Sequence, residues 1–319
     1  MRLKDFYREV VNRGIQVDVR GKQTIEVLLK DAKARYDKLS KSEQEVFDQD
    51  VLINPFSDTR ILCGDTNQEI KSVIVGIDVE GSELLLVDRL KAQGDIIDLV
   101  ISHHPEGMAY ANFYEVMDLQ VDVFAGEGVS LSAAEGLLAE RKQQVARRVH
   151  AANHQRSVDI AKLLKLNFLC MHTPCDNLAC DYMCKLIDKE KPDTLGKLMK
   201  IIEAIPEYKA AAKGNNPPKL VIGDKSSRCR KIHVEFTGGT EGPKNIYEKL
   251  SACGIDTVVA MHQSEEHYEK CKSANINVIF ASHIASDNLG VNLMLDHLES
   301  KGKLKVQEFS GFRRVSRKK

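Results

Sequence analysis

Histidines follow the ends of four apolar runs in this sequence. The runs are IIDLVIS, LNFLCM, DTVVAM and NVIFAS, and each has the length and composition of a buried strand. Ligands collect outside the carboxyl ends of strands in open α/β sheets, so we expect the side chains that follow these runs to meet at one edge. Six of the ten histidines lie just past these ends: His103, His104, His172, His262, His267 and His283.

His103 and His104 are adjacent and are followed by Pro105, which restricts the backbone. Two neighbouring imidazoles can diverge and each reach a different metal ion, because imidazole nitrogen is a common metal ligand. An HHP sequence could equally form a turn with no chemical role. The pair alone leaves both interpretations open.

Asp287 lies four residues after His283, where a helix is expected to begin. This spacing places an imidazole and a carboxylate on one helix face, one turn apart. Asp176, in HTPCDN, also stands at the start of an expected helix. Either aspartate could instead be a helix cap, because Asp is common near helix N-termini.

Together these residues make a ligand set of three histidines and two carboxylates. Such a mixed set suits Zn, Fe, Mn, Ni and similar divalent ions. Two ions about 3.5–4 Å apart would activate a water molecule, so no side-chain nucleophile is needed. In agreement, the sequence contains no G-x-S-x-G motif, which would indicate a nucleophilic serine. The predicted metal ligands are His103, His104, Asp176, His283 and Asp287.

Four cysteines offer a competing metal site, since Cys170, Cys175, Cys180 and Cys184 lie close together in the sequence. They contain no C-x-x-C pair, and Cys180 and Cys184 share a helix face, where thiols pack as small apolar groups. All eight cysteines are expected to be reduced in a cytosolic chain of this size.

The loop FTGGTEG connects an expected strand to an expected helix and contains Gly238 and Gly239. It is neither a Walker loop nor a G-x-G-x-x-G fingerprint. It could be a tight turn, or its backbone amides could bind an anionic group of a substrate. His267, in MHQSEEH, could lie near the metals or on a solvated helix surface.

Composition excludes several classes of protein. Lys plus Arg and Asp plus Glu both number 46 among 319 residues, so the formal net charge is zero. A neutral chain has no overall electrostatic reason to bind nucleic acid or an anionic membrane. No apolar run is long enough to span a bilayer, and MRLKDFYREV contains no signal-peptide core. We therefore predict a cytoplasmic α/β protein with neither nucleic acid nor membrane as a partner.

The chain divides into three expected segments, which are 1–54, 55–194 and 195–319. The first is helical and strongly charged, the second begins with a β-α-β unit that implies a parallel sheet, and the third repeats that style. Residues 108–160 are expected to form one or two helices outside the sheet. The basic tail GFRRVSRKK is expected to be solvated and frayed.

In order along the chain, GIDV, ISHHP, HTPCDN, FTGGTEG and ASHIASDN resemble the motifs of the Nif-three-like family, over about Pro55 to Leu298. Members are often catalogued as type 2 homologues of GTP cyclohydrolase I. The resemblance implies two related α/β halves with mostly parallel sheets flanked by helices. It also implies a dinuclear metal site between the halves at the carboxyl ends of the strands, and a homohexamer.

Residue by residue, the resemblance assigns His103 and His104 to one metal each and makes Asp176 a ligand. It aligns His283 and Asp287 with a late His-x-x-x-Glu motif whose carboxylate bridges both ions. Three residues match family positions close to the metals rather than ligands: His172, Gly238 and Gly239.

Two departures from the family matter for this chain. Asp287 replaces the usual glutamate, which shortens the bridging arm by one methylene. Residues 108–146 form a longer connection than the family usually has and could be a lid or a new interface.

Two hypotheses about a metal-binding function follow, beside a third in which the chain is an interaction scaffold with its helical N-terminal segment and residues 108–146 as partner surfaces. The first is a metal-dependent hydrolase that uses two divalent ions on a small-molecule phosphate, a nucleotide or a cyclic amide of purine type. The second is a metal-binding regulatory or metal-handling protein that turns nothing over. Open coordination positions on the ions would favour the first.

Overall fold

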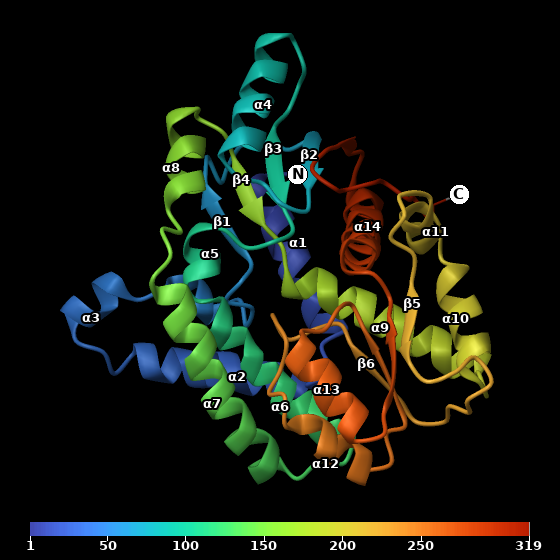
Figure 1. Cartoon of the computed structure of the whole chain (residues 1–319). Coiled ribbons are helices and arrows are strands. Elements are labelled where there is room, and N and C mark those ends of the chain that lie inside the picture. The colour runs from blue at the N-terminus through green and yellow to red at the C-terminus, as the bar shows by residue number, and fades with distance from the viewer. Residues whose placement is uncertain (319) are drawn as a thin grey trace.

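The computed structural model describes residues 1–318 and contains two β-sheets with long helices between and around them (Figure 1). The first sheet has the strand order β1-β4-β3-β2-β9, and the second has the order β5-β8-β7-β6. The strands are β1 (Arg60–Cys63), β2 (Ser72–Gly76), β3 (Leu99–Ser102), β4 (Phe168–Cys170), β5 (Lys219–Ile222), β6 (Ile232–Glu235), β7 (Thr257–Ala260), β8 (Asn277–Phe280) and β9 (Lys305–Glu308).

Helices supply the remaining regular structure. The α-helices are α1 (Leu3–Gln16), α2 (Gly21–Tyr36), α3 (Lys41–Val46), α4 (Gly81–Ala92), α5 (Gly107–Ala111), α6 (Leu119–Gly126), α7 (Leu131–His150), α8 (Arg156–Leu163), α9 (Thr173–Glu190), α10 (Leu195–Glu203), α11 (Pro206–Lys213), α12 (Ile246–Ala252), α13 (Glu265–Ser273) and α14 (His283–Lys301). Two 3₁₀-helices are η1 (Gln49–Leu52) and η2 (Phe113–Asp118). None of the helices within residues 1–318 is long and apolar enough to cross a membrane.

The two sheets share one plan. Each contains three parallel strands, β2-β3-β4 or β6-β7-β8, with an antiparallel edge strand beside the last of them, β1 beside β4 and β5 beside β8. The first sheet has β9 as a fourth parallel strand, on its other edge. Both edge pairs contain a register irregularity. Each of β4 and β8 leads directly into a long helix, α9 or α14. The prediction of an α/β fold with two related halves is confirmed.

The parallel strands are β-branched runs because both of their faces are covered. Every residue of β2, β3 and β7 is buried, as expected for strands in a sheet between helical layers. Helices α9 and α14 pack along each other between the two sheets. Gly290 permits this approach, since a Cβ atom there would lie 2.3 Å from the Cys175 carbonyl oxygen.

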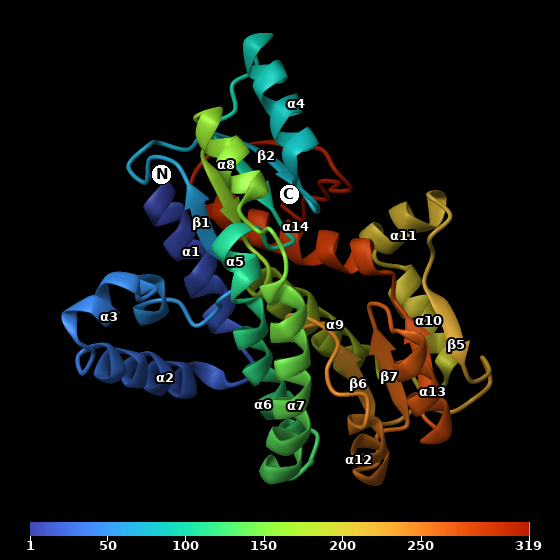
Figure 2. The same ribbon diagram turned by 60° about the vertical axis from the view of Figure 1, so that its left-hand side comes forward.

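The N-terminal segment is part of the first core rather than an appendage. Leu3, Phe6 and Val10 of α1 are fully buried in the same cluster as strand residues Val73 and Leu99. Helices α2 and α3 extend away from this body (Figure 2).

The C-terminal tail departs from the sequence prediction. Strand β9 pairs in parallel with β2, so the chain returns from the second half, assigned as 195–319, to the first sheet. Beyond β9 the tail is held rather than frayed. Phe312 is fully buried, Arg314 pairs with Asp296 at 2.5 Å, and Arg317 pairs with Glu207 at 2.7 Å. The last residue of the tail, at position 319, lies outside the described residues.

Residues 108–160 form more helices than the sequence predicted. They contain most of α5, then η2, α6, α7 and part of α8. Helices α6 and α7 run side by side next to the second sheet (Figures 1 and 2). Gln120 donates to the carbonyl oxygens of Gly238 and Thr240 at 2.8 and 2.7 Å, so this segment supports the glycine loop.

Candidate metal centre

Three chain segments place the histidines and aspartates in one cluster. His103 and His104 directly follow β3, and the neighbouring strand β4 leads through His172 to Asp176 in the first turn of α9. The second half contributes the first two turns of α14, with His283 at the start of the helix and Asp287 one turn later. The two halves thus contribute equivalent pairs, because His172 and Asp176 have the same spacing as His283 and Asp287 and stand at the same place after β4 and β8.

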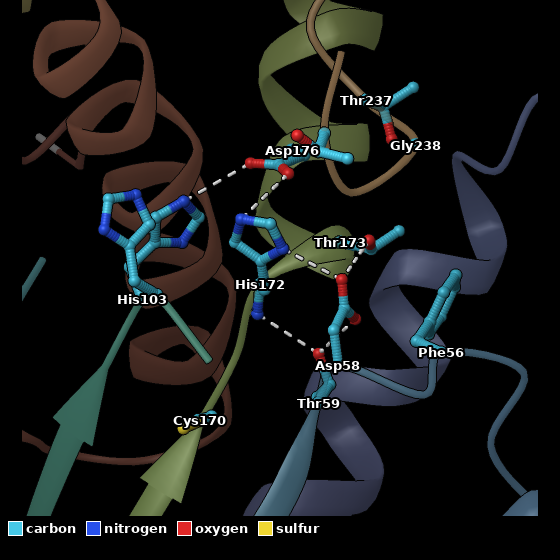
Figure 3. A network of polar contacts seen from close by, with 12 residues as sticks. Phe56, Asp58, Thr59, His103, Cys170, His172, Thr173, Asp176, Thr237 and Gly238 are labelled. Atoms are coloured by element: carbon cyan, nitrogen blue, oxygen red, sulfur yellow. Dashed lines mark hydrogen bonds and ion pairs between the residues drawn. The ribbon is translucent and has the colours of Figure 1, made fainter. Parts of the chain in front are cut away.

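The first ligand group is buried. The Nε2 atom of His103 lies 3.4 Å from Oδ1 of Asp176 and 3.5 Å from Oδ1 of Asp287. The three side chains are at most 7% exposed. Figure 3 shows His103 directed toward Asp176 and His172.

The second ligand group uses the other oxygen of the same aspartate. Oδ2 of Asp287 lies 3.5 Å from Nε2 of His104 and 3.6 Å from Nε2 of His283. Asp287 therefore faces one group with each oxygen. The shorter arm of aspartate reaches both groups, although the family resemblance implied a glutamate here.

These separations fit a bound cation better than direct hydrogen bonds. Charge-assisted N–H···O bonds are about 2.7–2.9 Å long, whereas two ligand atoms each about 2.0–2.2 Å from one ion are farther apart. His103 Nε2 and Asp287 Oδ2 are buried and have no hydrogen-bond partner. Buried polar atoms are nearly always paired. His103 Nε2 belongs to the first ligand group and Asp287 Oδ2 to the second, so each group contains an unpaired buried atom where a cation fits.

The opposite ring nitrogens are fixed by acceptors. Nδ1 of His103 lies 3.1 Å from the Met171 carbonyl oxygen, and Nδ1 of His104 lies 2.6 Å from Oδ1 of Asp78. An acceptor at Nδ1 leaves Nε2 as the free lone pair, which is the usual arrangement of metal-binding histidines.

His172 is held in the same way and is more central than predicted. Its Nδ1 lies 2.8 Å from Oδ2 of Asp58 (Figure 3), and Thr173 donates to the same oxygen at 2.6 Å. Its Nε2 faces Asp176 at 3.6 Å. His172 also forms a group with His103 and His104 that could hold a metal ion.

Sequence reasoning missed two carboxylates that orient these rings. Asp78 stands in GIDV, a motif with no role assigned to its aspartate, and Asp58 lies in a stretch without a motif. The sequence places His262 after a strand-like run but predicts no role for it. Its ring centroid lies 4.6 Å from that of His283, and Glu241 lies 3.7 Å from its Nδ1.

The electrostatics of the cluster favour positive charge. Burial acts to lower the pKa of His103, but Asp287 and Asp176 outweigh it and raise this pKa well above its usual value. The pKa of His104 is raised to about 9 by Asp287 and Asp78 against the effect of burial. Burial would raise the pKa of Asp287, yet His103 and His104 hold it far below its usual value. A cation would meet the same stabilising carboxylates.

The remaining sequence candidates lie at different distances from the cluster. Gly239, with a φ of +84°, lines a cavity of about 480 Å³, including its open mouth, together with His172, Asp176, His283 and Asp287. Gly238, with a φ of +101°, packs on Gln120. His267 does not join the cluster. It is buried, donates from Nε2 to the Gly242 carbonyl oxygen at 2.9 Å, and bonds Ser264 through Nδ1.

The cysteines form no metal-binding group within residues 1–318. All eight are free thiols, and no group of ligand-type side chains with metal-binding spacing contains a cysteine. Burial raises the pKa of the Cys175 thiol, the cysteine nearest His103. Cys180 packs in the core of the second half, with Cys184 against it.

Comparison with solved structures finds proteins of similar fold. A NIF3 superfamily protein from Sphaerobacter thermophilus has 28% sequence identity and a TM-score of 0.71, covering 80% of this chain and 91% of that one. Reduced HcgD from Methanocaldococcus jannaschii is more distant, with 12% identity, a TM-score of 0.47, and coverage of 84% and 94%. No protein-family model and no curated protein matches the sequence.

The fold and the clustered histidines and aspartates define an α/β protein with a candidate metal centre between two related halves. The chain is similar in fold and sequence to a NIF3 superfamily protein, which supports the family resemblance that its motifs predicted.

Proposed function

We propose that this chain binds two divalent metal ions and is a metal-dependent hydrolase. The observation that carries the proposal is the position of Asp287, whose two oxygens face two different groups of histidines. His103, Asp176 and Asp287 would hold one ion, and His104, His283 and Asp287 would hold the other.

When bound, two such ions polarise a phosphoryl or carbonyl oxygen and activate water for hydrolysis. The chain's own contribution is to fix the ligands before binding. Asp78 and the Met171 carbonyl orient His104 and His103, and the core around α9 and α14 holds the aspartates. Such pre-organisation limits the cost of ordering the site when a substrate enters.

The accessibility of the site favours catalysis over a closed structural site. The side chain of His283 is 38% exposed and that of His262 is 51% exposed, and both line the cavity beside the buried aspartates. Structural metal sites are closed, whereas catalytic sites keep a position open to substrate. A small phosphate ester, a nucleotide or a cyclic amide of purine type fits this proposal.

The first test is metal content by inductively coupled plasma mass spectrometry on gently purified protein. We expect about two ions per chain in the wild type and a clear loss in Asp287→Asn. Asp296→Asn is the matched control, because Asp296 lies on the same helix but pairs with Arg314. Wild-type protein that takes up no metal, or metal content indifferent to Asp287, would contradict the proposal.

The second test is turnover by metal-loaded protein, assayed with phosphate esters, cyclic amides and GTP. His104→Ala should abolish any hydrolysis, because His104 is one of the ligands. Equal rates in both proteins would assign the hydrolysis to a contaminant. Tight metal binding without turnover of any substrate would favour the regulatory or metal-handling alternative.

We also propose the homohexamer that the family resemblance implies. Multi-angle light scattering of the purified chain measures its mass directly, and a monomer or dimer at micromolar concentration would contradict this proposal.

A further inference from the structure

A second, larger cavity opens beside the proposed metal centre. It has a volume of about 1300 Å³ including its open mouth, and His104 is part of its wall. It is continuous with the smaller cavity, because both are lined by His172, Gly239, Thr240, His262 and His283. A molecule bound at the metal centre would therefore extend into this space.

One wall of the larger cavity is aromatic. The rings of Tyr110 and Phe113 are stacked, with centroids 5.7 Å apart and planes 14° apart. Both residues line the cavity, and both are half-buried. Tyr110 comes from α5 and Phe113 begins η2, so the wall belongs to residues 108–146, the connection that the family resemblance implies to be unusually long.

This wall is attached to the glycine loop beside the cluster. A Cβ atom at Gly239 would lie 2.7 Å from Val116 of η2 and 3.6 Å from the Phe113 ring. Gln120 adds its two hydrogen bonds to the loop carbonyls. The aromatic pair thus has a fixed position relative to the histidines.

The same cavity also has polar lining residues. Asn153, His154 and Arg156 line it, and Arg156 pairs with Glu80 at the rim at 2.6 Å. The lining of the cavity thus combines an aromatic pair, candidate metal-ligand side chains and hydrogen-bonding groups. Ligand sites have this composition, in which apolar surface provides affinity and a few polar groups fix orientation.

We propose that the substrate of this protein carries a planar aromatic ring, which packs against the Tyr110–Phe113 pair while an oxygen-bearing anionic group lies at the metal centre. The proposal rests on the proposed metal centre and goes beyond it by naming the substrate class. A flat ring suits this wall because offset-stacked and edge-to-face contacts between aromatic rings add to the burial of apolar area.

Two non-hydrolysable probes separate the ring from the anion. Phenylphosphonate and methylphosphonate carry the same anionic group, and only the first has a ring. Calorimetric titration of the zinc-loaded protein should give phenylphosphonate a dissociation constant on the order of tenfold lower than that of methylphosphonate.

Variants of the Tyr110–Phe113 pair test whether it causes the preference for phenylphosphonate. Tyr110→Leu keeps apolar volume but removes the ring, so it should lose most of the preference and bind methylphosphonate as the wild type does. Tyr110→Phe should retain the preference. Tyr114→Ala is the matched control, because Tyr114 lies on η2 but lines a different groove, beside Leu131 and Lys142.

The outcomes separate this inference from the proposed function. Zinc content is measured on every sample. A wild type that retains no zinc contradicts the metal centre and the inference with it. Zinc-loaded protein that binds neither probe, that shows no ring preference, or that keeps the preference in Tyr110→Leu overturns the inference alone.

Discussion

Asp78 is the residue whose effect on the site is most easily isolated. Its side chain is 64% exposed and makes one contact with the cluster, the 2.6 Å bond to Nδ1 of His104. The bond with His104 lowers the pKa of Asp78, so the carboxylate is a stable acceptor for the imidazole N–H. It therefore orients a predicted ligand without being one.

Replacing Asp78 with Ala should lower metal affinity about 10–100-fold and leave the fold intact, because partners that orient ligating histidines have effects of this size. Competition with a chromophoric zinc chelator measures the affinity. Asp88→Ala is the control, since Asp88 is an exposed residue of α4. Unchanged metal affinity in Asp78→Ala would mean that the backbone after β3 positions His104 and that the bond to Asp78 is not needed.

The clustering of the candidate ligands could be predicted from sequence, whereas the residues that orient the histidine rings could not. His103, His283 and Asp287 follow strand-like runs, so the rule that sites form at strand ends locates them. Asp58 reaches His172 across 114 residues of sequence, and no local pattern reports such a contact. Asp78 is part of the GIDV motif, but its contact with Nδ1 of His104 depends on how the segments after β2 and β3 come together.

Helices α9 and α14 are the elements on which the site depends. Each carries one predicted aspartate in its first or second turn, and the two helices touch where Gly290 meets the backbone of Cys175. A methyl group at Gly290 would have to push the helices apart, since the facing atom is a carbonyl oxygen rather than a flexible side chain.

We expect Gly290→Ala to lower the free energy of unfolding by about 3 kcal/mol, the upper part of the range for overpacking. It should also reduce metal content, because Asp176 and Asp287 would separate. Gly136→Ala on α7 is the matched control. No atom lies within 4 Å of a Cβ atom there, so this change should stabilise by about 0.5–1 kcal/mol. Urea denaturation measures both, and equal stabilities would contradict this account of the helix contact.

The C-terminal tail is the element that sequence reasoning described wrongly. A basic terminus is typically solvated. No pattern within the tail indicates that its arginines pair with Glu207 of α11 and Asp296 of α14. Glu207 is buried and receives two hydrogen bonds from Arg317, at 2.8 and 2.7 Å. The distance along the chain between these partners explains the error.

Removing this pair should destabilise the protein. Arg317→Ala leaves the Glu207 carboxylate buried with one remaining donor, Asn292, and we expect a loss of about 1–3 kcal/mol in the free energy of unfolding. Lys318→Ala, one residue further, serves as the control, because Lys318 is exposed and lies 3.8 Å from Glu299. Denaturation midpoints that do not separate the two variants would show that the tail contributes no stability.

At the scale of the whole molecule, the cluster joins the two halves. His103 and His104 belong to the first sheet, whereas His283 and Asp287 follow the last parallel strand of the second. The chain also returns to the first sheet through β9, and α1 lies in the same core. The halves are therefore connected by helices, by the tail and by the site itself, and we expect them to unfold in one transition.

Metal removal tests this connection. A ligand that binds only the folded state adds about 2.7 kcal/mol of stability at 100 times its dissociation constant, so chelation should lower the melting temperature by about 5 °C or more. Calorimetry with and without a chelator measures the shift, and added zinc should reverse it. Asp287→Asn should melt at the same temperature in both conditions, because it lacks the carboxylate shared by the two ligand groups. A wild type that contains metal yet melts identically with the chelator would show that its ions lie away from the junction between the halves.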